Sequence, residues 1–428
     1  MNDTRREFDL IVVGAGLAGM AATAFAVERG LKALQIGATP GEMHFASGLL
    51  DLLGIHSLKR RNRLDNPWAG ISALIQDSPK HPYARVGLEN IRHSLEVFVK
   101  ILDKAGLRYD GWPEENAVLA TCAGTAKITY KVPASMWPGV IGWKEKSPAL
   151  IIDFEGMKDF SALQMVRTIG SQWPGLRAQR LQFPYPLKGL DCQNIFMAEA
   201  LGSPRVRSDL AATIKPLLED AKLVGMPAIL GVRKSADIGA DLERQIGAVV
   251  FEIPTMPPSV PGLRLKEAME RELSRKGAAL LRGNRALAIN SSGRKCVSVV
   301  IGTRQSQETL KAKGVIIATG RFLGGGLAAS RSEIRETLLD LPVYQPEKRQ
   351  DWHLPSFLDP EGHPVNQAGL EVDDLLRPLG PHGRCAYKNL FAAGSLLAHQ
   401  DWKRMKCGAG LAIATAYGAV SSFLDLNS

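Results

Sequence analysis

Cysteine is scarce in this sequence, and no two cysteines lie at short spacing. The five cysteines are Cys122, Cys192, Cys296, Cys385 and Cys407, and no C-x-x-C occurs. Iron–sulfur clusters and structural zinc sites usually need thiolates at that spacing, so we expect no metal site in this chain. The odd count also argues against a disulfide framework and favours a reducing compartment, the cytoplasm.

A convincing membrane span is also missing. Two stretches, residues 10–27 and 407–424, carry no charged side chain and are just long enough for a membrane-spanning helix. The second is only weakly hydrophobic, because Ala, Gly, Ser and Thr supply much of it. Both are better explained as parts of one nucleotide-binding fold, so we expect no transmembrane segment in this chain.

The composition is otherwise that of a globular protein with a basic excess. The 428 residues include 53 Lys and Arg against 43 Asp and Glu, which gives a net charge of +10, and 45% are hydrophobic. Collagen-like, coiled-coil and disordered chains are excluded. The basic excess permits docking on an acidic partner, a membrane surface or a nucleic acid, but it says nothing about the fold.

The N-terminal residues have the pattern of a βαβ unit. An apolar run at residues 8–13 predicts a strand, an Ala-rich stretch to Glu28 predicts a helix, and residues 32–36 predict a second strand. A G-x-G-x-x-G loop joins the first two elements, the context in which this motif binds a nucleotide phosphate at a helix N-terminus. The expected phosphate-binding residues are Gly14, Ala15, Gly16, Leu17, Ala18 and Gly19.

An acidic residue expected after the second strand is absent. About 20 residues beyond the glycine loop an Asp or Glu usually holds the adenosine ribose, but residues 35–38 read Gln-Ile-Gly-Ala. The phosphate cradle is therefore present without its usual adenosine anchor. This combination weakens the case for NAD and FAD and favours FMN, with FAD as the alternative.

Further along the chain, three segments follow in the order typical of two-dinucleotide-binding flavoproteins. A helix near residues 263–273 precedes a small strand meander, a V-I-I-A-T-G strand at 315–320 and an N-L-F-A-A-G-S strand at 389–395. A glycine-containing helix start follows at residues 407–410. Resemblance to those flavoproteins implies that Thr319, Gly320, Gly394, Ser395, Gly408 and Gly410 contact the flavin. Ser395 stands where many relatives have an acid, so it is a weaker partner for the ribityl hydroxyls.

Several longer strings resemble one family more narrowly, the B subunits of anaerobic glycerol-3-phosphate dehydrogenase. They lie, in chain order, at residues 43–53, 81–83, 254–265, 325–327, 334–336 and 376–378. H-F-x-S-G-x-L-D-L-L and P-T-x-P-P-S-V-x-G-x-R-L are far more specific than the glycine loop. The segment 398–404 departs from the family pattern, which suggests a different partner contact or redox role there.

This resemblance implies a flavin-containing redox subunit, usually with FMN. Its implied partners are a catalytic FAD subunit and a membrane-anchoring iron–sulfur subunit, and the complex oxidises glycerol 3-phosphate to dihydroxyacetone phosphate and passes electrons to quinone. The chain is then expected in the cytoplasm, peripheral at the inner membrane through its partners. The resemblance also places His44, Ser47 and Gly48 near the flavin, without a covalent bond to His44.

Catalytic residues remain unassigned from the sequence. Six side chains form the pool from which a base or a phosphate ligand would come: His44, His81, His399, Arg321, Arg335 and Arg377. A further basic residue, Arg264, is expected in an ion pair on a helix surface, with binding of a phosphate or carboxylate as the other interpretation. Electron relay without substrate turnover needs none of these groups.

We therefore predict an α/β, Rossmann-like FAD/NAD(P)-binding flavoprotein fold with an inserted cap or partner-facing region. The flavin-binding domain is expected at residues 1–50, 263–330 and 385–428, and the cap at 51–262 and 331–384. Two other hypotheses stay open. One is a structural subunit with a degenerate flavin pocket, and the other, resting on charge alone, is a flavoprotein acting on RNA.

Overall fold

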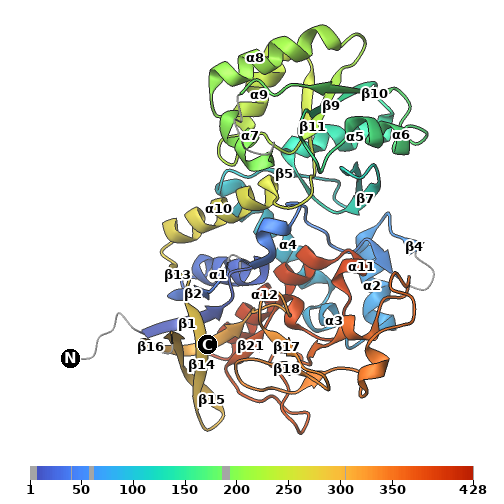
Figure 1. The fold of residues 1–428 in the computed structure, drawn as a ribbon. Coiled ribbons are helices and arrows are strands. Elements are labelled where there is room, and N and C mark those ends of the chain that lie inside the picture. The colour runs from blue at the N-terminus through green and yellow to red at the C-terminus, as the bar shows by residue number, and fades with distance from the viewer. Residues whose placement is uncertain (1–6, 40, 57–61, 186–192, 304, 428) are drawn as a thin grey trace. The chain divides into compact units, whose positions relative to one another are not determined.

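The computed structural model describes residues 7–39, 41–56, 62–185, 193–303 and 305–427. The chain divides into two compact units, each with its own sheet (Figure 1). Unit 1 comprises Met1–Glu42, Asp51–Gly106 and Met269–Ser428, and unit 2 comprises Met43–Leu50 and Leu107–Ala268.

Unit 1 is built on a mixed sheet in the order β13-β2-β1-β16-β15-β14, with β21 also paired to β16. The strands are β1 (Glu7–Val13), β2 (Ala33–Gly37), β13 (Ala279–Arg282), β14 (Arg285–Ser292), β15 (Lys295–Gly302), β16 (Gln307–Ile317) and β21 (Leu390–Ala392). β1 pairs in parallel with β2 and β16, and β21 pairs in parallel with β16, whereas β14, β15 and β16 form an antiparallel meander. Val13 is opposite Ile36 and Ile317, and Ile317 is opposite Ala392. The loops that follow these parallel strands therefore emerge at one edge of the sheet.

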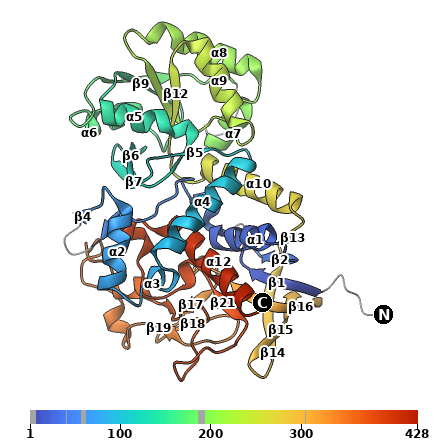
Figure 2. The same ribbon diagram turned by 180° about the vertical axis from the view of Figure 1, so that it is seen from behind.

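Two apolar helices, α1 (Leu17–Glu28) and α12 (Gly408–Asp425), pack against each other in unit 1 (Figure 1). α12 also contacts α3 (Pro82–Val86) and α4 (Leu88–Lys104), which lie beside it in the view from behind (Figure 2). These contacts bury most of α1 and α12, so the first uncharged stretch consists of the end of β1, the glycine loop and a core helix, and the second is a core helix. In the parts of the chain that the structure describes, no helix has the length and apolar character needed to cross a membrane.

The remaining elements of unit 1 are short. They are β3 (Ile55–His56), β4 (Asn62–Arg63), α2 (Pro67–Asp77), β17 (Leu327–Ala329), β18 (Ile334–Glu336), β19 (Val343–Tyr344), η5 (Arg349–Trp352), η6 (Pro364–Gln367), β20 (Gly369–Leu370), η7 (Gly394–Leu396) and α11 (Trp402–Met405). The chain enters unit 2 within the 3-10 helix η2 (Gly41–Phe45), returns to unit 1 at Asp51, enters unit 2 again at Leu107, and returns for the last time within α10 (Val260–Arg275).

Unit 2 contains a four-stranded parallel sheet in the order β10-β9-β11-β12. The strands of this sheet are β9 (Ala149–Phe154), β10 (Leu176–Leu181), β11 (Leu223–Pro227) and β12 (Val249–Ile253). The helices of unit 2 are α5 (Trp137–Glu145), α6 (Ala162–Ile169), α7 (Asn194–Ala200), α8 (Pro204–Ile214) and α9 (Ser235–Ile246). Its shorter elements are β5 (Tyr109–Asp110), β6 (Ala117–Ala120), β7 (Ala126–Thr129), β8 (Val132–Pro133), η3 (Ala134–Met136) and η4 (Lys215–Leu217). Every residue of β9 is buried. Trp173 stacks on Phe251 in the core, with ring centroids 6.2 Å apart.

The predicted fold class is confirmed, because unit 1 has the glycine-loop βαβ unit, the meander and the later parallel strands in the expected order. The compact units follow other boundaries than the predicted flavin and cap regions. Residues 51–106 and 331–384 belong to unit 1, and residues 43–50 belong to unit 2. The packing of α3 and α4 on α12 accounts for the first of these differences. Which segments bind flavin stays a prediction.

The described cysteines, Cys122, Cys296, Cys385 and Cys407, are free thiols, whereas Cys192 lies outside the described residues.

Candidate flavin site

The glycine loop is held tightly against its own βαβ unit. Gly14 has a φ of +134°, and a Cβ there would lie 2.1 Å from the carbonyl oxygen of Ala318, just beyond β16. A Cβ on Gly19 would lie 2.0 Å from the carbonyl oxygen of Gly14. Both glycines are therefore required by backbone packing alone, as the motif predicts.

Gly16 differs from the other two glycines, because its missing side chain leaves open space. A Cβ on Gly16 would meet no atom within 4 Å. Gly16 is the N-cap of α1, and among the described residues no side-chain hydrogen bond caps the start of that helix. Uncapped amides at the start of a helix attract an anion. The loop therefore has both the space and the donors for a phosphate.

Gln35, which sequence reasoning did not assign to the site, supports the loop from β2. Its side chain is almost fully buried, and its Nε2 donates to the carbonyl oxygen of Gly14 at 3.2 Å. Gln35 is a polar residue in an otherwise apolar strand, and this sequence feature could have identified it.

The end of β2 has no room for the ribose-binding acid. The expected position is occupied by Gly37, and a Cβ there would lie 2.3 Å from the Cβ of Ala15. Even alanine at this position would displace the glycine loop. The close packing of the glycine loop on β2 therefore excludes an acidic side chain at this position.

The loop after β16 lies beside the loop after β21. Gly320 has a φ of +70°, and a Cβ there would be 3.8 Å from Oγ of Ser395. Oγ1 of Thr319 is buried and has no hydrogen-bond partner among the described residues. A buried hydroxyl without a partner is uncommon and is typical of a ligand site. The structure thus brings Thr319, Gly320 and Ser395 together, and their contact with a flavin stays a prediction.

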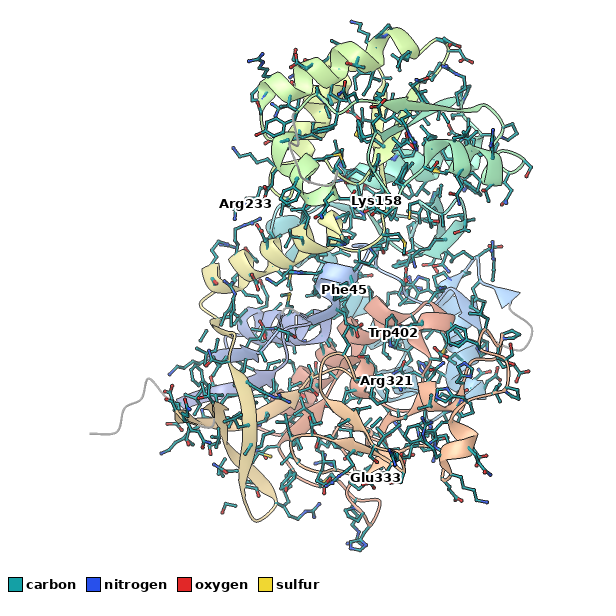
Figure 3. All side chains as sticks on the ribbon, viewed as in Figure 1. Phe45, Lys158, Arg233, Arg321, Glu333 and Trp402 are labelled. Carbon is teal, nitrogen blue, oxygen red and sulfur yellow. The ribbon has the colours of Figure 1, made fainter. Side chains whose placement is uncertain are left out.

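Arg321 follows these residues and is partly buried in unit 1 (Figure 3). Its guanidinium donates to the carbonyl oxygens of Val365, at 2.8 Å, and Asn366. Burial lowers the pKa of Arg321, although the nearby carboxylates of Asp401 and Glu42 oppose that shift. The two backbone contacts show that Arg321 holds the loop around η6 in place.

Gly394 joins the β21 loop to both core helices. It has a φ of +79°, and a Cβ there would lie 2.6 Å from the Cβ of Ala18 in α1. Its N–H donates to Oγ1 of Thr415 in α12 at 2.9 Å, and that hydroxyl donates to the carbonyl oxygen of Leu411. Thr415 is a positioning residue that the sequence pattern did not reveal.

Replacing Thr415 by valine is expected to destabilise the protein by about 1–3 kcal/mol, because the buried amide of Gly394 loses its acceptor while the side-chain volume is kept. Thr415→Ser keeps the hydroxyl and serves as the control. Chemical denaturation of both variants measures the difference. Equal stability of the two variants would show that the hydrogen bond is unimportant.

The start of α12 contains the two remaining predicted glycines. A Cβ on Gly408 would lie 2.9 Å from the ring of Trp402, and one on Gly410 would lie 2.4 Å from Oη of Tyr83. That hydroxyl donates to the carbonyl oxygen of Leu52 at 2.7 Å, and burial raises the pKa of Tyr83. Close packing of neighbouring side chains thus accounts for both glycines, and their contact with a flavin stays a prediction.

His44, Ser47 and Gly48 belong to unit 2, whereas the other predicted site residues belong to unit 1. The N–H of Ser259 donates to the carbonyl oxygen of His44 at 2.9 Å, and a Cβ on Gly48 would lie 2.8 Å from Cβ of Pro261. The two most specific strings of the sequence therefore pack on each other. Nε2 of His44 is buried and has no hydrogen-bond partner among the described residues.

Arg264, in the second of these strings, forms a buried ion pair. Its guanidinium donates to both carboxylate oxygens of Glu252, at 2.8 and 3.0 Å, and to the carbonyl oxygen of Gly231. The arginine side chain is 4% exposed and that of Glu252 is fully buried. The predicted surface location of Arg264 is therefore wrong, although the predicted ion pair is present. The partner lies on β12, which the helical pattern around Arg264 cannot indicate.

The glycine loop and strand order lead to a comparison with known proteins. A family model described as an FAD binding domain matches residues 9–411. The chain belongs to this FAD-binding family. Membership identifies it as a flavoprotein related to oxidoreductases and supports a flavin cofactor, FAD at least, without distinguishing FMN.

Two relatives are similar over nearly the whole chain. The B subunit of anaerobic glycerol-3-phosphate dehydrogenase from Vibrio cholerae serotype O1 is 29% identical, over 97% of this chain and 96% of its own. The protein of the same name from Yersinia pseudotuberculosis serotype I is 28% identical, over 96% of each chain. The predicted resemblance to B subunits is thereby confirmed. The crystal structure of 3-ketosteroid delta1-dehydrogenase from Sterolibacterium denitrificans has a TM-score of 0.44 and 11% identity, over 98% of this chain and 100% of that chain.

Proposed function

We propose that this FAD-binding family member is a flavin-containing redox subunit of a quinone-linked glycerol-3-phosphate dehydrogenase. The complex would oxidise sn-glycerol 3-phosphate to dihydroxyacetone phosphate and pass the electrons to quinone, in anaerobic respiration on glycerol. One observation carries this proposal: the end-to-end similarity to proteins named as the B subunit of that enzyme, with 97% of this chain and 96% of the relative covered.

FMN is the cofactor that we propose, with FAD as the alternative. Open space at Gly16 and the uncapped start of α1 suit a phosphate, which both flavins carry. Gly37 stands where an acid usually binds the adenosine ribose, and Ala15 leaves no room for a side chain there. FMN has no adenosine and needs no such acid, so both features support the mononucleotide.

The chain's own residues would bind and orient the flavin. The amides of residues 14–19 would hold its phosphate, and Thr319 and Ser395 would donate hydrogen bonds to its hydroxyl groups. The positive N-terminal end of α12 would favour negative charge nearby. When bound, a flavin supplies a two-electron acceptor. Electron relay requires no proton-accepting side chain, so no catalytic residue is assigned.

The proposed partners are a catalytic FAD subunit and a membrane-anchoring iron–sulfur subunit of the same complex. Because no described helix has the character of a membrane span, we infer that any attachment to the inner membrane runs through those partners. The net charge of +10 supports docking on an acidic surface.

A structural subunit with an empty flavin pocket is the second candidate. It is favoured by the replacement of two expected acids, since Gly37 and Ser395 stand in their positions. The two candidates predict different results when the complex is assembled with a pocket variant.

Reconstitution of the three-subunit complex tests the proposed function. Glycerol-3-phosphate-dependent reduction of a quinone is measured with this chain, without it, and with a variant that cannot bind flavin. We expect turnover only with the wild-type chain. Full turnover with the flavin-free variant would support the structural role, and turnover without the chain would exclude both candidates.

A further inference from the structure

A pocket of about 180 Å³ lies in unit 1, outside the residues proposed to bind flavin. Three segments form it: residues 80–85 at and before α3, the chain from the end of β20, and residues 397–399 after η7. Ala398 and His399 belong to the stretch that departs from the B-subunit pattern. Its apolar wall consists of Pro82, Leu370, Val372, Leu379, Leu397 and Ala398.

The polar wall of the pocket has more cationic than anionic groups. Lys80, Arg85, Glu371 and His399 line it. Nζ of Lys80 and Nε2 of His399 both contact Oε1 of Glu371, at 3.2 and 2.8 Å. Burial by itself would raise the pKa of Glu371, but the hydrogen bonds from His399 and Lys80 outweigh it, and the net shift is downward. Glu371 therefore stays ionised and compensates only one of the positive groups.

Arg85 contributes a second positive charge that is only weakly compensated. Its Nη1 contacts Asp374 at 2.6 Å, but the carboxylate of Asp374 is 85% exposed. Exposed ion pairs contribute little energy and exchange readily with solvent or ligand. Arg85 is therefore available to an anion that enters the pocket.

The backbone holds the imidazole of His399 in a fixed position. His399 has a φ of +62°, a region that non-glycine residues rarely adopt. The N–H of His399 donates to the carbonyl oxygen of Gln367 at 3.0 Å, and its ring lies 4.1 Å from that of Tyr344. Such a strained residue persists only where the surrounding contacts determine it, and these residues are frequent at ligand sites.

The neighbouring histidine does not add charge to the pocket. His81 is 1% exposed, and burial, followed by the charges of His399 and His56, lowers its pKa to about 3. It is therefore neutral at physiological pH, and its Nδ1 accepts from the N–H of Tyr83 at 3.1 Å. The fixed charges that an incoming ligand meets are those of Lys80 and Arg85 against those of Glu371 and Asp374.

We propose that this pocket binds the oxyanion group of a small molecule between Lys80, Arg85 and the Glu371-paired His399. The group is a phosphate or a carboxylate, and the apolar wall contacts a short carbon chain attached to it. The site contains no residue proposed to bind flavin, so it can be tested whether or not the chain carries a flavin.

Calorimetric titration of the purified full-length chain tests the proposal. Sulfate, inorganic phosphate and acetate are the oxyanion probes, glycerol 3-phosphate adds a carbon chain, and glycerol is the neutral control. We expect an oxyanion and the phosphate ester to bind, and glycerol not to bind. Tighter binding of phosphate than acetate identifies a phosphate group, and the reverse order identifies a carboxylate.

Two variants test whether the oxyanion binds in this pocket. The double variant Lys80→Ala/Arg85→Ala removes both cations of the pocket wall and should weaken oxyanion binding by at least about tenfold. Arg233→Ala, which removes a surface arginine paired with Glu267, is the matched control and should leave it unchanged. Absence of binding to all probes, or equal binding by the double variant, would overturn the proposal.

A variant of His399 tests the role of its imidazole. His399→Gln keeps a hydrogen-bond donor for Glu371 but removes the ring that lies 4.1 Å from that of Tyr344. We expect sulfate affinity to fall in this variant, and unchanged affinity would contradict a role for His399.

Discussion

Gly16→Glu is expected to abolish flavin binding without unfolding the protein. Gly16 has a φ of −79°, which any residue adopts, and a Cβ there meets no atom within 4 Å. The glutamate would occupy the phosphate position and repel the phosphate. We expect flavin affinity to fall by at least about 100-fold, which corresponds to about 2.7 kcal/mol. The ratio of flavin absorbance to protein after purification measures the loss.

Two other glycine variants separate binding from folding. Gly16→Ala should fold normally, because its methyl group fits the open space at this position. It should bind flavin more weakly, because that methyl group takes part of the space proposed for the phosphate. Gly19→Ala places its methyl group 2.0 Å from the carbonyl oxygen of Gly14 and should destabilise the protein by about 3 kcal/mol or more. The free energy of unfolding of flavin-free Gly16→Glu should stay within about 1 kcal/mol of the wild-type value. Retention of flavin by Gly16→Glu would show that the phosphate is bound elsewhere.

Arg264→Met is expected to destabilise the protein by about 3–5 kcal/mol, because it leaves the carboxylate of Glu252 buried without its cation. Ser135 and the N–H of Leu230 would still donate to that carboxylate, but neither carries a charge. The loss should concern unit 2, whose β11 loop Arg264 holds at Gly231. Chemical denaturation with a probe of the Trp173 environment measures it.

The double variant Arg264→Met/Glu252→Met provides the decisive comparison. Because it removes both charges, it should be less destabilised than the sum of the two single variants. Additive losses would show that the pair does not interact. Arg335→Ala, at the surface, should change stability little.

The same ion pair predicts how stability depends on pH. Burial would raise the pKa of Glu252, but the charge and hydrogen bonds of Arg264, with the hydrogen bonds from Ser135 and the N–H of Leu230, lower it below the ordinary value of 4.5. A carboxylate whose pKa is lower in the folded state stabilises the protein fully above its unfolded pKa. This stabilisation should be lost as the pH falls below about 4.5, and Glu252→Gln should be less sensitive to acid.

The N-terminal half of the flavin site is predictable from sequence because it is local. Strand, glycine loop and helix follow one another directly, and the glycine spacing reports both the turn at Gly14 and the helix contact at Gly19. The C-terminal strands were predictable as elements, since each is a short apolar run with flanking glycines. The convergence of Gly320, Ser395 and Gly394 on the glycine loop depends on strand register, which no local pattern contains.

The sheet of unit 2 was not predictable in the same way. Its strands have only five or six residues; β9 and β11 are mostly apolar, a pattern that does not separate a buried strand from a piece of buried helix, and β10 carries two arginines and a glutamine that hide its apolar character. The partners of Arg264 and Thr415 were missed for a related reason. Glu252 and Gly394 lie on other elements, so only tertiary packing brings each pair together.

Identification of the flavin released from the purified chain tests the central claim most directly. An absorbance spectrum is recorded, the protein is denatured by heat, and the released cofactor is separated by chromatography. We expect a flavin spectrum and release of FMN. Release of FAD would contradict the inference drawn from Gly37, and a protein that stays colourless after incubation with both flavins would contradict the proposed redox role.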